Sequence, residues 1–207
     1  MLKCLIISEN YILSYNTFKV AYTIGLIAGS VIRAVYTRQY KKNTIADDHK
    51  TAQDKLLISL SSLGLIIIPL FYLLSPWLDF ADYQLPVWVG WVGVAVFAFA
   101  LWLLWRSHVD LGRNWSPSLE IMEEHSLVTG GVYRYIRHPM YAAHWVWGIA
   151  QVLLLQNWIA GFSMLVFFLP MYLMRVPHEE KMMLKNFGEE YRQYTSRTGR
   201  VIPRLRL

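Results

Sequence analysis

Residues 141–174 read YAAHWVWGIAQVLLLQNWIAGFSMLVFFLPMYLM, and this stretch decides the fold. It consists of two apolar runs, 141–156 and 158–174, which meet at Gln156 and Asn157. An apolar run of about 20 residues can cross a bilayer as an α-helix, and shorter runs suffice where a helix ends within protein. Because two residues allow no more than a turn, we predict two antiparallel membrane helices joined as a tight hairpin.

Three further apolar runs precede this hairpin, at residues 18–34, 56–74 and 87–105. Of the 207 residues, 55% are hydrophobic and only 16% are charged, whereas soluble domains usually carry about 25% charged residues. A soluble helical bundle would need polar helix faces, and runs such as LSSLGLIIIPLFYLL have almost none. We therefore expect an all-α, polytopic integral membrane protein with five transmembrane helices.

The basic residues predict the orientation of these helices. All but two of the 20 Lys and Arg residues lie in three blocks, 33–55, 106–137 and 175–206, and these blocks alternate correctly with five spans. The positive-inside rule places such blocks in the cytoplasm. We expect the N-terminus outside and the C-terminus in the cytoplasm. The net charge of +6 then reflects topology, and no nucleic-acid partner is expected.

Unusual polar residues gather in the second half of the chain. We expect a single membrane domain over 1–207, in which 1–109 hold the first three transmembrane helices and 110–207 form the functional half. An amphipathic helix is predicted after Pro177, because four apolar side chains recur at spacings of three and four. They are Leu184, Phe187, Tyr191 and Tyr194. This helix is expected to lie along the cytoplasmic interface or to dock onto the bundle.

Two charged motifs flank the hairpin, YIRHPMY at its start and RVPHEE at its end. Pro139 favours the first turn of a helix, so His138 would lie beside free backbone N–H groups that can bind an anion. Arg175 and Glu179 are four residues apart and can share one helix face. Since the hairpin returns to the same membrane face, the two motifs are expected to face each other across it. Alternatively, the arginine and histidine are interfacial anchors.

No metal site is expected. Cys4 is the sole cysteine, so neither a disulfide within the chain nor a cysteine cluster can form. His138 and His144 are six residues apart and do not share a helix face, and HEE at 178–180 lacks the spacing of a zinc-protease helix. The pair Gly130–Gly131 is typical of a plain turn, not of a dinucleotide fingerprint.

Three stretches taken together carry a family resemblance: HSLVTGGVYRYIRHPMYAAHWVWG, RVPHEEKMMLKNFGEEYRQY and VIP. The combination R-H-P-x-Y, then R-x-x-x-E-E, then F-G-x-x-Y resembles the isoprenylcysteine carboxyl methyltransferase and phospholipid methyltransferase family. The resemblance covers about residues 110–203. Length and span count are most similar to prokaryotic members of the isoprenylcysteine type.

The resemblance implies an integral membrane methyltransferase that uses S-adenosylmethionine, most typically for carboxyl O-methylation of an isoprenylcysteine-type acceptor whose lipid tail arrives from the bilayer. It implies that Arg175 binds the substrate and that Arg175 and Glu179 are catalytic. The residues implied to bind the cofactor are Glu120, His125, Ser126, Leu127, Val128, Tyr133, His138, Pro139, Met140, Tyr141 and Glu179. His144 stands where many members have a small residue, and no role is implied for it.

Alternative functions stay open at this point. For a carboxylate acceptor, already ionised near neutral pH, Arg175 would hold the acid with two hydrogen bonds, and no covalent intermediate is needed. A phospholipid or amine N-methyltransferase would instead need a base, for which Glu179 is the nearest candidate. An NADPH-dependent sterol-type reductase shares a similar C-terminal pattern but usually has more spans. A non-catalytic membrane protein would use the polar clusters only as anchors.

Overall fold

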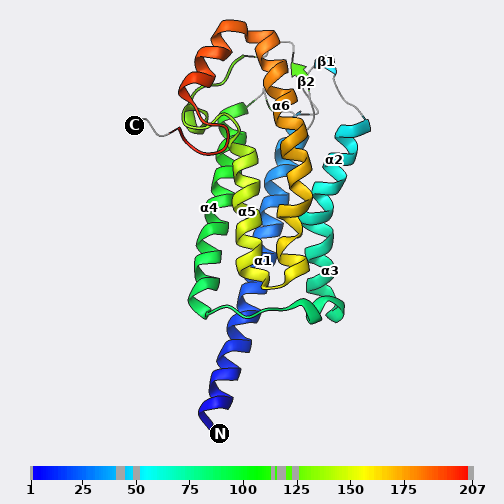
Figure 1. Ribbon diagram of the computed structural model, residues 1–207, viewed down its shortest axis with the longest axis vertical. Helices are drawn as coiled ribbons and strands as arrows, with labels where there is room; N and C mark the ends of the chain where they lie inside the picture. Colours follow the sequence, from blue (N-terminus) through cyan, green and yellow to red (C-terminus); the bar gives the residue numbers. More distant parts are fainter. Residues whose placement is uncertain are drawn as a thin grey trace.

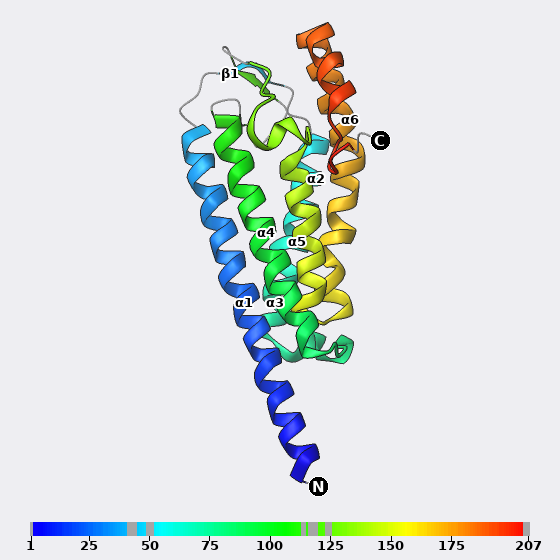
Figure 2. The same ribbon diagram turned by 90° about the vertical axis from the view of Figure 1, so that its left-hand side faces the viewer.

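The computed structural model is an elongated bundle of helices that run along one long axis (Figure 1, Figure 2). It describes residues 2–40, 45–48, 52–112, 115, 120–122 and 126–204, with side chains at 14–39, 52–112, 115 and 126–204. The helical elements are α1 (Leu2–Tyr40), α2 (Ala52–Ser62), the π-helical turn η1 (Leu63–Ile67), α3 (Ile68–Leu74), the 3-10 turn η2 (Pro76–Ala81), α4 (Val87–Leu111), the 3-10 turn η4 (Gly131–Arg134), α5 (Pro139–Leu155) and α6 (Trp158–Arg197).

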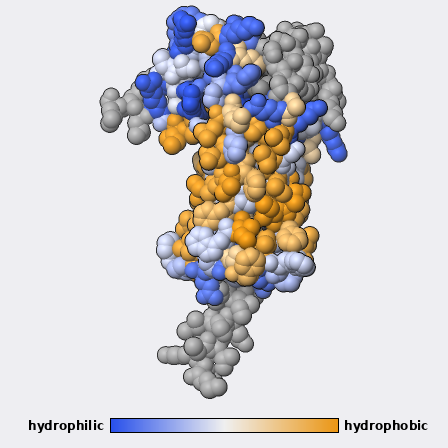
Figure 3. All heavy atoms as spheres, turned by 45° about the vertical axis from the view of Figure 1, so that its right-hand side comes forward, coloured by the Kyte–Doolittle hydropathy of each residue, from blue (hydrophilic) through white to orange (hydrophobic). Residues whose placement is uncertain are grey.

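The apolar runs of the sequence form the shaft of this bundle. Four segments are long and apolar enough to cross a membrane: Ser14–Gln39, Ala52–Leu74, Val87–Leu111 and Trp158–Arg197. Figure 3 shows apolar residues around the middle of one face and polar residues beyond them toward both ends. The predicted helical membrane fold is confirmed. The count of five spans stays a prediction, because α5 has only 17 residues.

A small sheet was not predicted from the sequence. Strand β1 (Ile45–Asp48) pairs in antiparallel fashion with β2 (Glu120–Met122), near the end of the bundle at which α5 begins (Figure 1). Strands of four and three residues are too short to produce an alternating apolar pattern that could be recognised in a sequence. The fold is therefore helical except for this one pair of strands in the described chain.

The predicted tight hairpin is present between α5 and α6. Gln156 ends α5 in the left-handed conformation, with φ 47° and ψ 43°, and reverses the chain in a single residue. Asn157 then caps α6, since its Oδ1 accepts hydrogen bonds from the N–H groups of Ile159 at 3.0 Å and Ala160 at 2.8 Å. These bonds satisfy two of the amide groups that every helix leaves free at its start.

Asn157 also ties the hairpin to the connector between α3 and α4. Its buried side-chain Nδ2 donates to the carbonyl of Leu78 and to Oδ1 of Asp82, both at 2.7 Å. One fully buried amide thus makes four hydrogen bonds that join segments far apart in the sequence. The turn of the hairpin is consequently fixed from both sides.

A buried polar cluster joins the helices in the middle of the bundle. Gln151 of α5 donates to the carbonyl of Ala160 at 2.6 Å and to Ser163 at 3.0 Å, and it accepts from Tyr22 of α1 at 2.7 Å. Ser163 donates to the carbonyl of Gly64 in the π-helical turn at 2.8 Å. A side chain at Gly64 would collide with the backbone of Ser163, so glycine allows the two helices to approach closely. Such polar contacts between small residues are typical of membrane helix packing.

The end of α6 differs in detail from the predicted amphipathic helix. The helix continues through Pro177 and bends at Gly188, where φ is 50° and ψ is −119°. Its last turns fold back toward the bundle (Figure 1). The bend divides the predicted apolar stripe: Tyr191 and Tyr194 are buried, whereas Leu184 is 37% exposed. Docking onto the bundle, one of the two expected arrangements, therefore holds for the part after Gly188.

We expect Asn157→Ala to lower the free energy of unfolding by about 2 kcal/mol, because it removes a helix cap and two further buried hydrogen bonds. Thermal unfolding in detergent would measure the change. Asn186→Ala is the matched control: Asn186 is exposed and makes one bond, to the carbonyl of Met182 at 2.8 Å. Equal effects of the two substitutions would contradict the prediction.

Candidate active site

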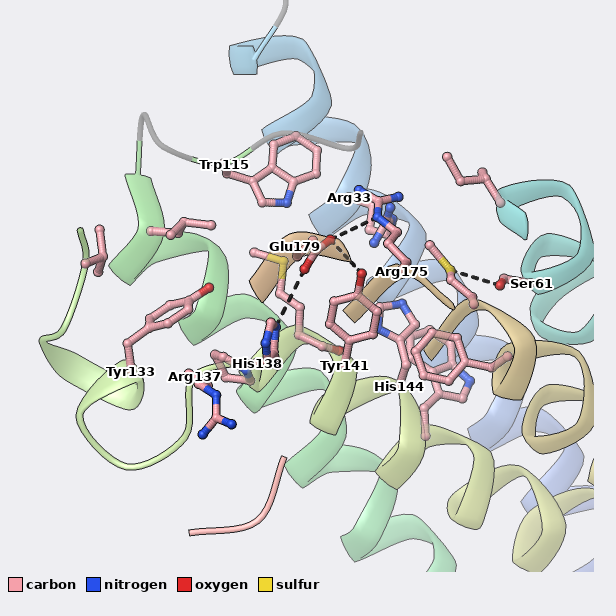
Figure 4. A pocket seen from close by; sticks show the side chains of 18 of the residues that line it. Arg33, Ser61, Trp115, Tyr133, Arg137, His138, Tyr141, His144, Arg175 and Glu179 are labelled. Atoms are coloured by element: carbon pink, nitrogen blue, oxygen red, sulfur yellow. Dashed lines mark hydrogen bonds and ion pairs between the residues drawn. The ribbon is translucent and has the colours of Figure 1, made fainter. Parts of the chain in front are cut away.

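A pocket of about 440 Å³ lies at the end of the bundle where α5 begins (Figure 4). Ten of the residues predicted for the site line it: Ser126, Leu127, Val128, Tyr133, His138, Pro139, Met140, Tyr141, Arg175 and Glu179. His125 and the side chain of Glu120 lie outside the described residues. The pocket also receives side chains from α1 and α2, so both of the predicted halves, 1–109 and 110–207, contribute to it.

The pocket is polar at one end and apolar at the other. The polar end contains the start of α5 and the middle of α6. The apolar part reaches between the membrane-spanning helices and is lined by Ile58, Leu65, Ile66, Trp147, Met164, Phe168 and Met171. A ligand that fills the pocket would therefore need a charged or polar group joined to a long apolar one.

The start of α5 offers free backbone donors to the pocket. His138 precedes the helix without a side-chain cap, and Pro139 has no N–H to donate. The amides of Met140 and Tyr141 belong to the first turn, where no preceding carbonyl of the helix can accept their hydrogens. This arrangement, which the sequence predicted, suits an anionic group of a ligand.

Glu179 is the centre of the polar end (Figure 4). Its Oε1 accepts hydrogen bonds from the hydroxyl of Tyr141 at 2.7 Å and from Nε of Arg175 at 2.9 Å. Its Oε2 lies 3.6 Å from Nδ1 of His138. The predicted pairing of Arg175 with Glu179 at a spacing of four residues is therefore present.

Arg175 retains an unused donor. Its side chain is only 5% exposed, and Nη1 has no hydrogen-bond partner in the structure as described. A buried donor left without a partner costs about 1–3 kcal/mol. An acceptor on a bound ligand would satisfy this group, so Arg175 is a candidate ligand-binding residue for a chemical reason independent of its motif.

The neighbouring residue Glu180 has a different role from Glu179. Its carboxylate accepts from Nε of Arg137 at 2.6 Å and from Nη2 of Arg200 at 2.6 Å, and it lies 3.3 Å from Nε2 of His138. The hydrogen bond to Glu180 raises the pKa of Arg200 above its ordinary value. His138 lines the pocket, but both of its ring nitrogens face carboxylates. The side chain of His138 therefore holds the start of α5 against Glu179 and Glu180. The backbone amides of the first turn of α5 are the donors available to a ligand.

The segment at 198–200 is held against the start of α5 by backbone hydrogen bonds. The N–H groups of Arg137 and His138 donate to the carbonyls of Gly199 and Arg200, both at 2.9 Å. Nη1 of Arg137 donates to the carbonyl of Thr198 at 2.7 Å. The residues before Pro139 are thereby fixed by a segment that follows α6.

The glycine pair forms the predicted turn and positions Tyr133. Gly131 has φ of 58°, and a side chain there would collide with the carboxylate of Asp110. That carboxylate accepts from the N–H of Val132 at 2.8 Å and pairs with Arg106 at 2.7 Å. Burial raises the pKa of Tyr133 well above its ordinary value, so its hydroxyl stays protonated.

His144 also lines the pocket, although the sequence assigned it no role. Its Nδ1 lies 2.6 Å from the carbonyl of Met140, and because a carbonyl can only accept, Nδ1 carries the hydrogen. Its ring stacks on Phe168 with centroids 5.2 Å apart. The imidazole thus fills the wall of the pocket between its polar and apolar parts.

Sequence reasoning missed one charged residue of the pocket, Arg33 of α1 (Figure 4). A signal was present, because Arg33 falls inside the apolar run 18–34, and a charge within a membrane span is a functional candidate by default. Arg33 also belongs to the basic block 33–55, which predicts only the orientation of the helices. The contact itself depends on helix packing, which the sequence does not reveal.

Comparisons with known proteins agree with the motifs. Residues 91–185 match the family model described as the Isoprenylcysteine carboxyl methyltransferase (ICMT) family. Protein-S-isoprenylcysteine O-methyltransferase B of Arabidopsis thaliana is 26% identical over 156 residues, which cover 74% of this chain and 79% of the relative. Protein-S-isoprenylcysteine O-methyltransferase of Homo sapiens is 30% identical over 139 residues, which cover 63% of this chain and 49% of the relative.

A solved structure is also similar. It is described as the eukaryotic intramembrane Ras methyltransferase ICMT without a monobody, with a TM-score of 0.50 and 26% identity. The match covers 76% of this chain and 54% of that chain, so this chain spans about half the length of the solved protein and of the human relative. The comparisons confirm the resemblance that the motifs predict and support the predicted class, an integral membrane methyltransferase.

We expect Glu180→Gln to lower the free energy of unfolding by about 2 kcal/mol, because Arg137 and Arg200 lose a shared counter-charge. Glu189→Gln is the matched control, since Glu189 is 67% exposed and pairs only with exposed Arg192, at 3.5 Å. Its effect should stay within about 0.5 kcal/mol. Unfolding of both variants in detergent would measure the difference, and a Glu180→Gln protein as stable as the parent would contradict the prediction.

The glycine pair provides a second test. Gly131→Ala should weaken binding at the pocket and lower the unfolding temperature by several degrees, because the new side chain meets Asp110 in a left-handed backbone conformation. Gly130→Ala should be tolerated, since its φ is −94° and no atom lies within 4 Å of the added carbon. Thermal unfolding of the two variants would measure the difference. Indistinguishable behaviour would show that the turn does not depend on Gly131.

Proposed function

We propose, from the similarity to the isoprenylcysteine carboxyl methyltransferase family and from the pocket, that this protein is an integral membrane enzyme that methylates the carboxylate of an isoprenylcysteine-type acceptor. The observation that carries the proposal is the guanidinium of Arg175. It is buried where the polar and apolar parts of the pocket meet, oriented by Glu179, and has an unpaired donor at Nη1. This is the group and the place that a lipid-linked carboxylate requires.

The polar end fits S-adenosylmethionine as methyl donor. When bound, this cofactor supplies a methyl group on a sulfonium, whose carbon–sulfur bond breaks as a carboxylate oxygen bonds to the methyl carbon. The first-turn amides of Met140 and Tyr141 would hold the cofactor's carboxylate. The rings of Tyr133 and Tyr141 line the same end and offer aromatic faces to a cation. The pocket's volume lies within the usual range for small-molecule sites.

The chain's residues favour a carboxylate acceptor over an amine. A carboxylate is ionised near neutral pH and needs no base. An amine would have to lose a proton, and the candidate base, Glu179, already accepts hydrogen bonds from Tyr141 and Arg175 at its Oε1. Glu179 therefore acts by orienting Arg175, which would hold the acid by two parallel hydrogen bonds. Fixed orientation of this kind can lower a barrier by several kcal/mol.

The apolar part of the pocket suits the acceptor's lipid tail. Most of its lining comes from α2, η1 and α6, which belong to segments long and apolar enough to lie in a bilayer. We propose that the tail reaches the pocket from the membrane and that the acid remains at the polar end. Few water molecules would then surround the reacting groups, which strengthens every charge interaction there.

We propose further that the polar end faces the cytoplasm and that the N-terminus lies outside. Arg33, Arg137 and Arg175 come from the three basic blocks of the sequence, and all of them line this one pocket. The three blocks thus meet at one end of the bundle, as the positive-inside rule requires for a common membrane face. The acidic connector between α3 and α4 lies at the opposite end (Figure 1).

We expect detergent-purified protein to bind S-adenosylhomocysteine but not NADPH in calorimetric titrations, and to methylate an S-farnesylcysteine acid. Arg175→Ala should lower kcat/KM for the acid by about 100-fold, the loss expected for one buried charged contact, with S-adenosylhomocysteine affinity within about three-fold of the parent. Exposed Arg192→Ala is the control and should change neither. Binding of NADPH alone would favour a reductase, and unchanged methylation by Arg175→Ala would remove the role assigned to that arginine.

A further inference from the structure

A second guanidinium group lies beside Arg175 in the pocket (Figure 4). It belongs to Arg33 of α1, which precedes the region that matches the family model, residues 91–185. The two positive charges are close enough to repel each other. A fold that brings two arginines together inside a membrane bundle is costly unless something negative lies between them.

The described part of the chain does not supply that negative charge to Arg33. Glu179 pairs with Arg175, and Glu180 pairs with Arg137 and Arg200. Asp54 of α2, which is buried, acts electrostatically on Arg175 together with Glu179. Among the ion pairs formed between described side chains, none involves Arg33.

Arg33 does not behave as an arginine that only anchors a helix at the membrane surface. Successive residues of an α-helix are about 100° apart, so positions two away lie on nearly the opposite face. Val31 and Val35 are 55% and 45% exposed, on the outside of the bundle. Arg33 is therefore directed inward, where it lines the pocket, and an inward charge on a membrane helix marks a ligand site by default.

We propose that Arg33 is a second binding residue for the acceptor's carboxylate, so that α1 and α6 hold the acid between two guanidinium groups. The inference rests on the proposed function and extends it to a residue outside the family's motifs. The unpaired Nη1 of Arg175 and the guanidinium of Arg33, which lines the same pocket, can both bind one carboxylate. Methylation turns that carboxylate into a neutral ester, which removes the charge that both arginines bind. The pair thus distinguishes substrate from product and favours product release.

The test compares an acid with its neutral isostere. S-farnesylcysteine analogues that end in a carboxylate or a carboxamide would be titrated into protein saturated with S-adenosylhomocysteine. We expect the parent protein to bind the acid more tightly. Arg33→Ala should weaken acid binding by about ten-fold or more and change amide binding less than two-fold. Affinity for S-adenosylhomocysteine should not change, which also reports that the pocket is folded.

Two further variants make the test specific. Arg33→Gln keeps much of the side chain's length and polarity but removes its charge, so it should reproduce the loss even if Arg33→Ala does not fold. Arg38→Ala is the matched control, because Arg38 is an exposed arginine near the end of the same helix. It should alter the affinity of neither analogue.

The possible failures are distinguishable. If the parent protein methylates the acid and prefers it to the amide, but the Arg33 variants keep that preference, the inference is overturned and the proposed function stands. Equal weakening of acid and amide would likewise overturn it, since Arg33 would then act on packing. If the parent protein neither methylates the acid nor prefers it, the proposed function fails and the inference fails with it.

Discussion

The carboxylate of Glu180 holds together the end of the bundle that contains the pocket. It accepts hydrogen bonds from Arg137 before α5 and from Arg200 after α6, and it lies beside His138. Three segments that are far apart in the sequence are joined by one side chain. Because Glu180 lies on the same turn of α6 as Glu179, fixing the first also fixes the direction of the second. The two adjacent carboxylates therefore have different roles. Glu180 joins the segments before α5 and after α6, and Glu179 orients Arg175 in the pocket.

The electrostatics of the pocket follow from this arrangement. Glu180 pairs with Arg137 and Arg200, whereas Glu179 pairs with Arg175, on which buried Asp54 also acts. An unpaired buried donor such as Nη1 of Arg175 is unfavourable in the free protein, and a bound acid of the kind proposed would relieve that cost. The free protein is thereby adapted to an anion before the anion arrives. Such preorganisation requires little rearrangement at the moment of reaction.

Much of the fold could be predicted from the sequence because a bilayer permits few backbone conformations. Apolar runs must form helices whose backbone groups pair internally, and a gap of two residues between runs permits only a hairpin. Six of the ten predicted site residues that line the pocket lie in the two motifs at the ends of that hairpin, which the hairpin brings together. Glycine at 131 was predicted to make a turn, and its left-handed backbone shows why.

The remaining features depend on contacts that no local pattern encodes. The strands β1 and β2 are paired across a long stretch of chain and are too short to show a period. The bend at Gly188 interrupts a stripe that, by spacing alone, belongs to one straight helix. Arg33 enters the pocket only because α1 packs beside α4 and α5. The different roles of Glu179 and Glu180 likewise follow from their directions on α6, not from their identity.

The segment at 198–200 has a consequence for how the molecule is made. It lies against residues 135–138 by a parallel bridge between Ile136 and Gly199 and by two backbone hydrogen bonds, and it supplies Arg200 to Glu180. Synthesis runs from the N-terminus, so all of the described helices are made before this segment. The N–H groups of Arg137 and His138 therefore gain their partners only after α6 has been synthesised.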